Sequence, residues 1–247
     1  MKLGELAWPA VADLDRETIV LSPIAALEQH SRHLPFLTDA ILCTAVAEKL
    51  EAALAQDVLL LPTQWLGASA HHLGMAGSLT AENDTYLRLI AEPLRCLLRH
   101  GFSKMFILNG HGGNADAFHL ALRQLALEFP RAFLGGANYW DLAGVEIAST
   151  LAGSRKGVGH ACEFETSMMM HLRPDLVRTG EIKDDELKPV PPELRDIYIP
   201  LDMRRQTSHG GTGQPSLATA EKGGVLLAAV VEKGVAMLRA LRRHCPE

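Results

Sequence analysis

The stretch MFILNGHGGNADAFHLALRQLALEF, residues 105–129, contains a complete strand–turn–helix unit. Met105–Leu108 is a short uninterrupted apolar run, which is typical of a strand buried on both faces. NGHGGN, residues 109–114, has the glycine content of a turn, and Ala115–Phe129 has the length and amphipathic pattern of a helix. A buried strand that leads through a short turn into a helix is the repeating unit of α/β folds.

The same alternation extends over most of the chain. We predict further strands at Thr18–Leu21, Val58–Leu61 and Ala132–Leu134, and further helices at Asp39–Leu54, Asn83–His100 and Ala218–Arg243. This order predicts a three-layer α/β/α sandwich with a mostly parallel central sheet. We expect residues 1–247 to form a single domain, in which Lys183–Pro200 is a long excursion or lid-like loop. Pro93 lies inside a predicted helix, where we expect a kink or a break.

The composition excludes several classes of protein. With 247 residues, 47% of them hydrophobic and 21% charged, the chain is a globular protein and neither disordered nor collagen-like. A net charge of −5 argues against a nucleic-acid partner. The 4 cysteines form no CxxC pair, and the apolar residues of the N-terminus are interrupted by Glu5, Asp13 and Asp15. We therefore expect a cytoplasmic protein with no membrane segment.

Histidine and carboxylate residues gather in three segments that follow predicted strands or begin helices. The segment after the first strand contains Glu28, His30, His33 and Asp39, NGHGGN contains His111, and GHACEFETS contains His160, Glu163 and Glu165. Ligands of open α/β sheets lie beyond the carboxyl ends of the strands, so these segments are expected to meet. Imidazole and carboxylate ligands without a thiolate pair suit zinc, manganese or iron of the hydrolytic type.

Each segment also has a simpler interpretation. NGHGGN could be a glycine-rich turn with a capping histidine, although it lacks the lysine of a phosphate-binding loop and the spacing of a dinucleotide fingerprint. Glu163 and Glu165 could merely oppose the positive end of a helix dipole. The joint occurrence of three such segments favours a metal site.

At this point the chain resembles the creatininase (creatinine amidohydrolase) family. The matching segments are LEQHSRHLPFLTDA (27–40), LNGHGGN (108–114), GHACEFETSMM (159–169) and PSLATAEKG (215–223). The resemblance extends from about Leu21 to Gly223 and implies the creatininase-like form of the sandwich. It also implies homo-oligomers such as hexamers.

The resemblance implies two divalent metal ions per chain, whether zinc, manganese or iron. Glu28, Asp39 and His111 would bind one ion, and His30, Asp39 and a further carboxylate the other, with a metal-bridging hydroxide that attacks an amide carbonyl. In the creatinine-hydrolysing members an aromatic residue and a metal-binding glutamate stand where this chain has Gly112 and Gly113. We infer that Glu163 replaces that glutamate. His160 would match the family's proton-transfer histidine and Glu165 the carboxylate of its ETS motif, both as catalytic residues, and His33 would support the ligands.

The missing aromatic side chain at Gly112 leaves room for a substrate larger than creatinine. The expected reaction is hydrolysis of a C–N bond in a small-molecule amide. Cleavage of a mycofactocin-type precursor peptide and deformylation of a formamidopyrimidine remain alternatives. His72 and Trp140 are the predicted substrate-binding residues. Two interpretations from other classes are a metallophosphoesterase, whose motif set is absent, and a non-enzymatic scaffold that retains a structural metal.

Overall fold

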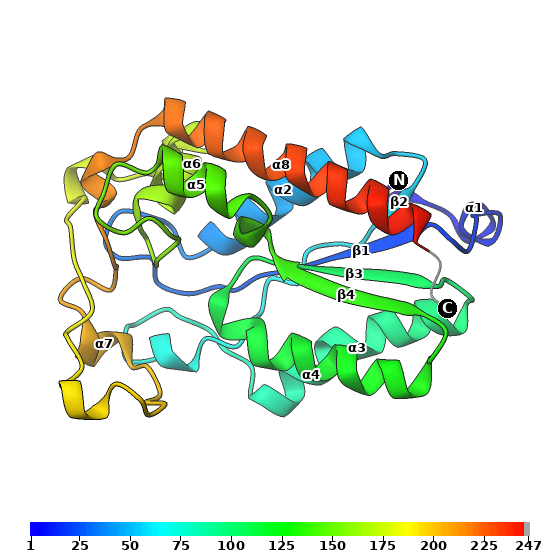
Figure 1. The fold of residues 1–247 in the computed structure, drawn as a ribbon, viewed down its shortest axis with the longest axis horizontal. Helices are drawn as coiled ribbons and strands as arrows, with labels where there is room; N and C mark the ends of the chain where they lie inside the picture. Colours follow the sequence, from blue (N-terminus) through cyan, green and yellow to red (C-terminus); the bar gives the residue numbers. More distant parts are fainter. Residues whose placement is uncertain (245–247) are drawn as a thin grey trace.

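Four parallel strands form the centre of the molecule. The computed structural model describes residues 1–244, and in it the strands are β1 (Ile19–Ile24), β2 (Val58–Leu60), β3 (Lys104–Asn109) and β4 (Phe133–Asn138). Their order in the sheet is β2-β1-β3-β4, and every pairing is parallel (Figure 1). The central strands β1 and β3 are buried along their whole length. This is why their sequences lack the polar alternation of a strand with one wet face.

Helices cover both faces of the sheet, which confirms the predicted three-layer class (Figure 1). One face carries α2 (Thr38–Ala53), α5 (Gly144–Thr150), α6 (Glu163–Leu172) and α8 (Ala220–Arg243), and the other carries α3 (Asn83–Arg99) and α4 (Ala115–Glu128). Successive residues of a strand point to opposite faces of the sheet. Leu108 therefore packs in the hydrophobic core on the α2 side, and Ile107 packs in the core on the α3 side. Two short helices, α1 (Trp8–Ala12) and α7 (Met203–Gln206), lie outside these layers. No helix within residues 1–244 is both long enough and apolar enough to cross a bilayer.

The predicted elements are all present, with shifts at some boundaries. The strand expected at Ala132–Leu134 continues through Gly135 and Gly136 to Asn138. Pairing with β3 along its whole length holds these glycines extended, and local sequence does not reveal that pairing. Of the kink or break expected at Pro93, the break is wrong, because α3 continues through Pro93 as one helix. Pro93 is exposed, so solvent can reach the backbone group that its missing N–H leaves without a partner.

The excursion at residues 183–200 is irregular and mostly exposed, apart from one helical turn at Pro192–Leu194. It leads into α7, and its end borders the same cavity as the loops that follow the strands, through Tyr198 and Pro200. The segment therefore lies over the carboxyl end of the sheet, where the histidine and carboxylate residues gather.

The close packing of α6 on α8 depends on Gly223. A Cβ added at Gly223 would overlap the backbone carbonyl oxygen of Ser167, whereas one added at Gly224 would meet only the His171 ring, at 3.2 Å. Helix propensity alone would make either alanine substitution stabilising by about 1 kcal/mol.

We expect Gly223→Ala to lower the free energy of unfolding by about 1–3 kcal/mol, because the two helices must separate to admit the methyl group. Gly224→Ala is the matched control and is expected to be neutral or slightly stabilising. Urea unfolding followed by circular dichroism measures both. A Gly223→Ala protein as stable as the parent would contradict the close approach.

Candidate metal centre

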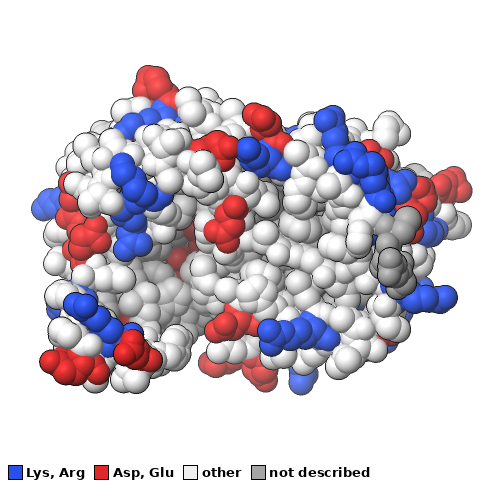
Figure 2. Space-filling view, in the orientation of Figure 1, with Lys and Arg blue, Asp and Glu red and all other residues white. Residues whose placement is uncertain are grey.

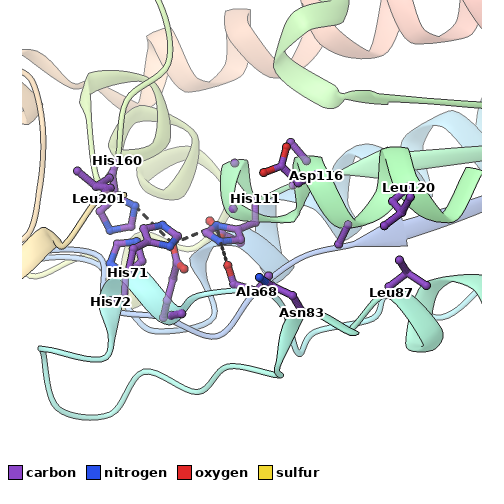
Figure 3. Close-up of a pocket in the computed structure, with 18 of the residues that line it drawn as sticks. Ala68, His71, His72, Asn83, Leu87, His111, Asp116, Leu120, His160 and Leu201 are labelled. Carbon is purple, nitrogen blue, oxygen red and sulfur yellow. Dashed lines mark hydrogen bonds and ion pairs between the residues drawn. The ribbon is translucent and has the colours of Figure 1, made fainter. Parts of the chain in front are cut away.

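Six histidine and carboxylate side chains come together at the carboxyl ends of the strands. Glu28 and His30 lie in the loop after β1, Asp39 in the first turn of α2, His111 directly after β3, His160 before α6, and Glu165 in the first turn of α6. His72 joins them from a short turn after β2 (Ala70–His72). Figure 3 shows the His72, His111 and His160 rings close together at one end of a pocket, beside His71.

Short distances connect these side chains into one cluster. His111 Nδ1 lies 3.2 Å from both Glu28 Oε1 and Asp39 Oδ2. His30 Nε2 lies 2.9 Å from Asp39 Oδ1 and 3.9 Å from Glu165 Oε1. Asp39 thus stands between His111 on one side and His30 on the other.

The three carboxylates of the cluster are buried and incompletely hydrogen-bonded. Glu28, Asp39 and Glu165 are 0%, 3% and 5% exposed. Both oxygens of Glu28, Asp39 Oδ2 and Glu165 Oε2 have no hydrogen-bond partner among the described residues. A buried carboxylate is costly unless positive charge or hydrogen bonds compensate it. The arrangement therefore calls for cations in the middle of the cluster.

The pKa values of the cluster express the same need for positive charge. Burial raises the pKa of Glu165 to about 7, although the charge of His30 opposes the shift. Burial alone would lower the pKa of His30, but the negative charge of Asp39 outweighs it and raises that pKa to about 9. Burial alone would also lower the pKa of His111, but the negative charge of Glu28 outweighs it and raises that pKa well above its usual value. Protons on imidazole therefore balance the carboxylates when no metal is bound, and a metal ion can take their place.

The donor set fits divalent metal ions. Ligand atoms of Glu28, His30 and Asp39 lie within 4.8 Å of one another, as do those of His30, His160 and Glu165 and those of Glu28, His71 and His111. Mixed imidazole and carboxylate donors suit zinc, manganese and iron.

Glu163 does not belong to this cluster, and its assignment as the replacement metal ligand is corrected here. Its carboxylate accepts hydrogen bonds from the backbone N–H groups of Ala152 (3.0 Å) and Gly153 (2.9 Å) and from Lys222 Nζ (2.6 Å). Successive helix residues are rotated by about 100°, so Glu163 and Glu165 point to nearly opposite sides of α6. Glu165 faces the cluster and stands where the sequence analysis had placed Glu163.

Two adjacent glycines of NGHGGN have different surroundings. A Cβ added at Gly113 would overlap the backbone oxygen of Ala68 and the His111 ring, so no side chain fits there. A Cβ added at Gly112 would meet nothing within 4 Å. The glutamate expected at Gly113 from the creatinine-hydrolysing members is thus excluded by packing in this chain, and a carboxylate can reach the cluster only from another segment.

Gln29 contacts two histidines of the cluster, although its sequence context did not single it out. Its Oε1 accepts from the Ser31 N–H at 2.8 Å and its Nε2 donates to the Gly210 oxygen at 2.8 Å, which fixes the orientation of the amide. The same Nε2 lies 2.8 Å from His72 Nδ1, so this ring nitrogen must accept and His72 Nε2 must carry the proton. The protonated Nε2 of His72 lies 3.2 Å from Glu28 Oε1, close enough for an electrostatic contact but without a hydrogen bond. The only signal in the sequence was its position between Glu28 and His30.

The backbone of Gln29 also orients His160. His160 Nε2 donates to the Gln29 carbonyl oxygen at 2.6 Å, which leaves Nδ1 as the acceptor nitrogen facing the cluster, 3.5 Å from Glu28 Oε1. Burial, reinforced by the charge of His30, lowers the pKa of His160 well below its usual value. His160 is therefore a neutral imidazole with a free lone pair at the edge of the cluster.

The remaining predicted residues lie around this centre. His33 is buried behind it, with its Nε2 2.9 Å from Thr166 Oγ1. Trp140 borders the cavity and packs against Tyr139, and His71 borders it and stacks on His111 with ring centroids 5.5 Å apart. The cavity has a volume of about 1300 Å³. Figure 2 shows the hollow in the molecular surface, with acidic atoms visible inside it.

Comparison with known proteins agrees with this geometry. The family model "Creatinine amidohydrolase" matches residues 4–238. The mycofactocin precursor peptide peptidase of Mycobacterium tuberculosis (strain H37Rv) is 31% identical over 99% of this chain and 93% of its own length. The creatinine amidohydrolase of Pseudomonas putida is 28% identical over 99% of this chain and 97% of its own.

Solved structures give the same result. A putative creatinine amidohydrolase from Bacteroides fragilis has a TM-score of 0.83 and 30% identity, and covers 100% of this chain and 98% of its own. A creatininase described as a Zn-Zn type and another described as a manganese form each have a TM-score of 0.80 and 26% identity. Each covers 100% of this chain and 98% or 99% of its own.

We expect Glu163→Gln to lower the free energy of unfolding by about 2 kcal/mol, because a buried charged acceptor loses strength toward Lys222 and two backbone groups. The metal content per chain should stay unchanged. Urea unfolding and elemental analysis measure the two effects. Loss of metal from a folded Glu163→Gln protein would return this residue to the list of ligands.

Proposed function

The chain belongs to the creatininase family, and on that basis we propose that it is a binuclear metal-dependent amidohydrolase that cleaves a C–N bond. The observation that carries this proposal is the set of buried carboxylate oxygens without hydrogen-bond donors, which converge with two imidazoles on one point. A cluster that served only to stabilise the fold would pair these oxygens with donors.

The ligands divide naturally into two groups that share Asp39. Glu28, Asp39 and His111 would hold one ion, since His111 Nδ1 is equally close to both carboxylates. His30, Asp39 and Glu165 would hold the other, since His30 Nε2 approaches both of these carboxylates. Two divalent ions in such a site, whether zinc, manganese or iron, supply Lewis acidity toward an amide carbonyl and acidify water as the nucleophile.

Residues of the chain prepare the proton transfers of the reaction. His160 holds an acceptor nitrogen at the edge of the cluster, because the Gln29 carbonyl occupies its other nitrogen. It can take a proton from the attacking water and return it to the leaving amine. His72 keeps its proton on Nε2, 3.2 Å from Glu28 Oε1, so it would support that carboxylate electrostatically and not as a metal ligand through this nitrogen.

The size of the cavity favours the peptide alternative over creatinine. The space above Gly112 is open, and the cavity volume of about 1300 Å³ is far beyond the needs of one small ring. The mycofactocin precursor peptide peptidase and the creatinine amidohydrolase described above both align over nearly the whole chain. An amide within a longer chain is therefore the preferred substrate, and creatinine is the second candidate.

We also propose that the protein is a homo-oligomer. Seven large apolar side chains in residues 187–201 are exposed in the single chain: Leu187, Val190, Leu194, Ile197, Tyr198, Ile199 and Leu201. Apolar exposure concentrated in one segment is typical of a surface that contacts another molecule.

Elemental analysis of the purified protein should find about two divalent ions per chain, and Glu165→Gln should retain about one. The same variant should lose at least about 100-fold in kcat/KM, because one of the two Lewis acids is missing. Formation of creatine from creatinine, and release of a new amino group from a formylated aminopyrimidine and from short peptides, each with and without chelator, measure activity. Glu163→Gln is the matched control, two residues away on the same helix. Full activity and two ions in Glu165→Gln would contradict the proposed centre.

A further inference from the structure

We propose that the groove between α3 and α4 is a substrate subsite that binds an extended peptide segment adjoining the scissile amide. The inference rests on the proposed hydrolase activity and names the substrate class for the same site. The cavity that contains the metal cluster does not end there. It continues between the two helices, and its walls include Asn83, Asp84, Leu87 and Arg88 of α3 and Asp116, Leu120 and Gln124 of α4.

These residues recur at helical spacing, so each helix presents one continuous face to the groove. Figure 3 shows the arrangement: His72, His111 and His160 lie at one end, Asn83 and Asp116 in the middle, and Leu87 and Leu120 at the other end. The groove therefore begins at the reacting centre and leads away from it.

The length of the groove suits several residues of extended chain. From Asp116 to Gln124 the helix rises about 12 Å, and from Asn83 to Arg95 about 18 Å, at 1.5 Å per residue. An extended peptide advances about 3.3 Å per residue, so roughly four or five residues would occupy this length. A compact ring held at the metal centre would not reach Leu87 or Leu120.

The chemistry of the groove suits an apolar side chain several residues from the scissile bond. Leu120 is 46% exposed although it borders a cavity, and Leu87 is partly buried opposite it. The far end of the groove is closed by Arg95, which Glu128 holds with two bonds of 2.7 Å and Glu92 with one of 2.6 Å. This fixed ion-pair network marks the limit of the subsite, and the two leucines form its apolar part.

Gly112 lies between the metal cluster and the groove, where a substrate chain that occupies both would have to pass. It borders the cavity directly after His111 and one helical turn before Asp116. Since nothing lies within 4 Å of a Cβ placed there, a side chain can begin at this position without displacing the backbone. We expect a large side chain at this position to extend into the entrance of the groove.

The test compares two substrate lengths in matched variants. The substrates are six-residue alanine peptides in which one leucine occupies each position in turn, and blocked two-residue amides. We expect the wild-type holoenzyme to prefer a six-residue peptide with leucine at one particular position. Leu120→Asp should lower kcat/KM for that peptide at least about 10-fold, mainly through KM, because the apolar contact is lost. Cleavage of the two-residue amide should not change.

Val225→Asp is the matched control for Leu120→Asp. Val225 is 57% exposed on α8, in the opposite helical layer, and its variant should behave as the wild type toward both substrates. Gly112→Trp provides a second, independent variant. It should retain the wild-type metal content, while cleavage of the six-residue peptide falls at least about 10-fold more than cleavage of the two-residue amides.

Three results would overturn the inference. Equal cleavage of both substrate lengths, with no effect of Leu120→Asp or Gly112→Trp, would leave the hydrolase intact and remove the subsite. A change in oligomer size on Leu120→Asp, seen by light scattering, would mean that a second copy of the chain covers the groove. Absence of both bound metal and amide cleavage in the wild type would instead refute the proposed function itself, and the subsite with it.

Discussion

Charge compensation at the carboxyl ends of the strands is the constraint around which the rest of the structure is arranged. Three carboxylates lie almost completely buried within one cluster, and two imidazoles stand between them. Burial of this negative charge without compensation would cost more free energy than the net folding stability of a typical domain. The fold therefore brings His30 and His111 to the same point as the carboxylates, from loops that follow β1 and β3. The parallel order of the strands makes this possible, because all their carboxyl ends face one side.

A second layer of contacts sets which atom carries each proton. Hydrogen bonds with Ser31 and Gly210 hold the side-chain amide of Gln29 in one orientation. This orientation determines which ring nitrogen of His72 carries the proton. The backbone oxygen of Gln29 fixes the proton of His160. Side-chain and backbone groups of one residue thus prepare two histidines for different tasks. The protonated nitrogen of His72 lies near a carboxylate, whereas His160 has an acceptor nitrogen that faces the cluster.

Sequence patterns were sufficient for most of the fold and for four residues of the site. Buried apolar runs identify strands without tertiary information, and Glu28, His30, Asp39 and His111 follow strands closely enough for their positions to be predicted. The choice between Glu163 and Glu165 required the rotation of α6 about its axis, which depends on packing against α2 and α8. A sequence motif does not distinguish two carboxylates that are separated by one residue. On a helix, however, their side chains point to nearly opposite sides. The groove between α3 and α4 could not be predicted from the sequence either, because it forms only where the two helices lie side by side.

The two adjacent glycines of NGHGGN affect both the source of the carboxylates in the cluster and the size of the cavity beside it. Gly113 packs so closely on Ala68 and His111 that any side chain there would displace the His111 ring or the backbone of Ala68. A carboxylate from that position is thus incompatible with this backbone path, and Glu165 fills the gap from another helix. Gly112 faces open space, so its lack of a side chain is a feature of the cavity and not a packing requirement. The packing at Gly113 therefore means that a further carboxylate of the cluster must come from another helix, and the open space at Gly112 leaves the cavity wide beside the cluster. Because these two demands act on neighbouring residues of a single turn, a change in metal ligation and a change in substrate length can arise within the same few residues, without any change in the surrounding fold.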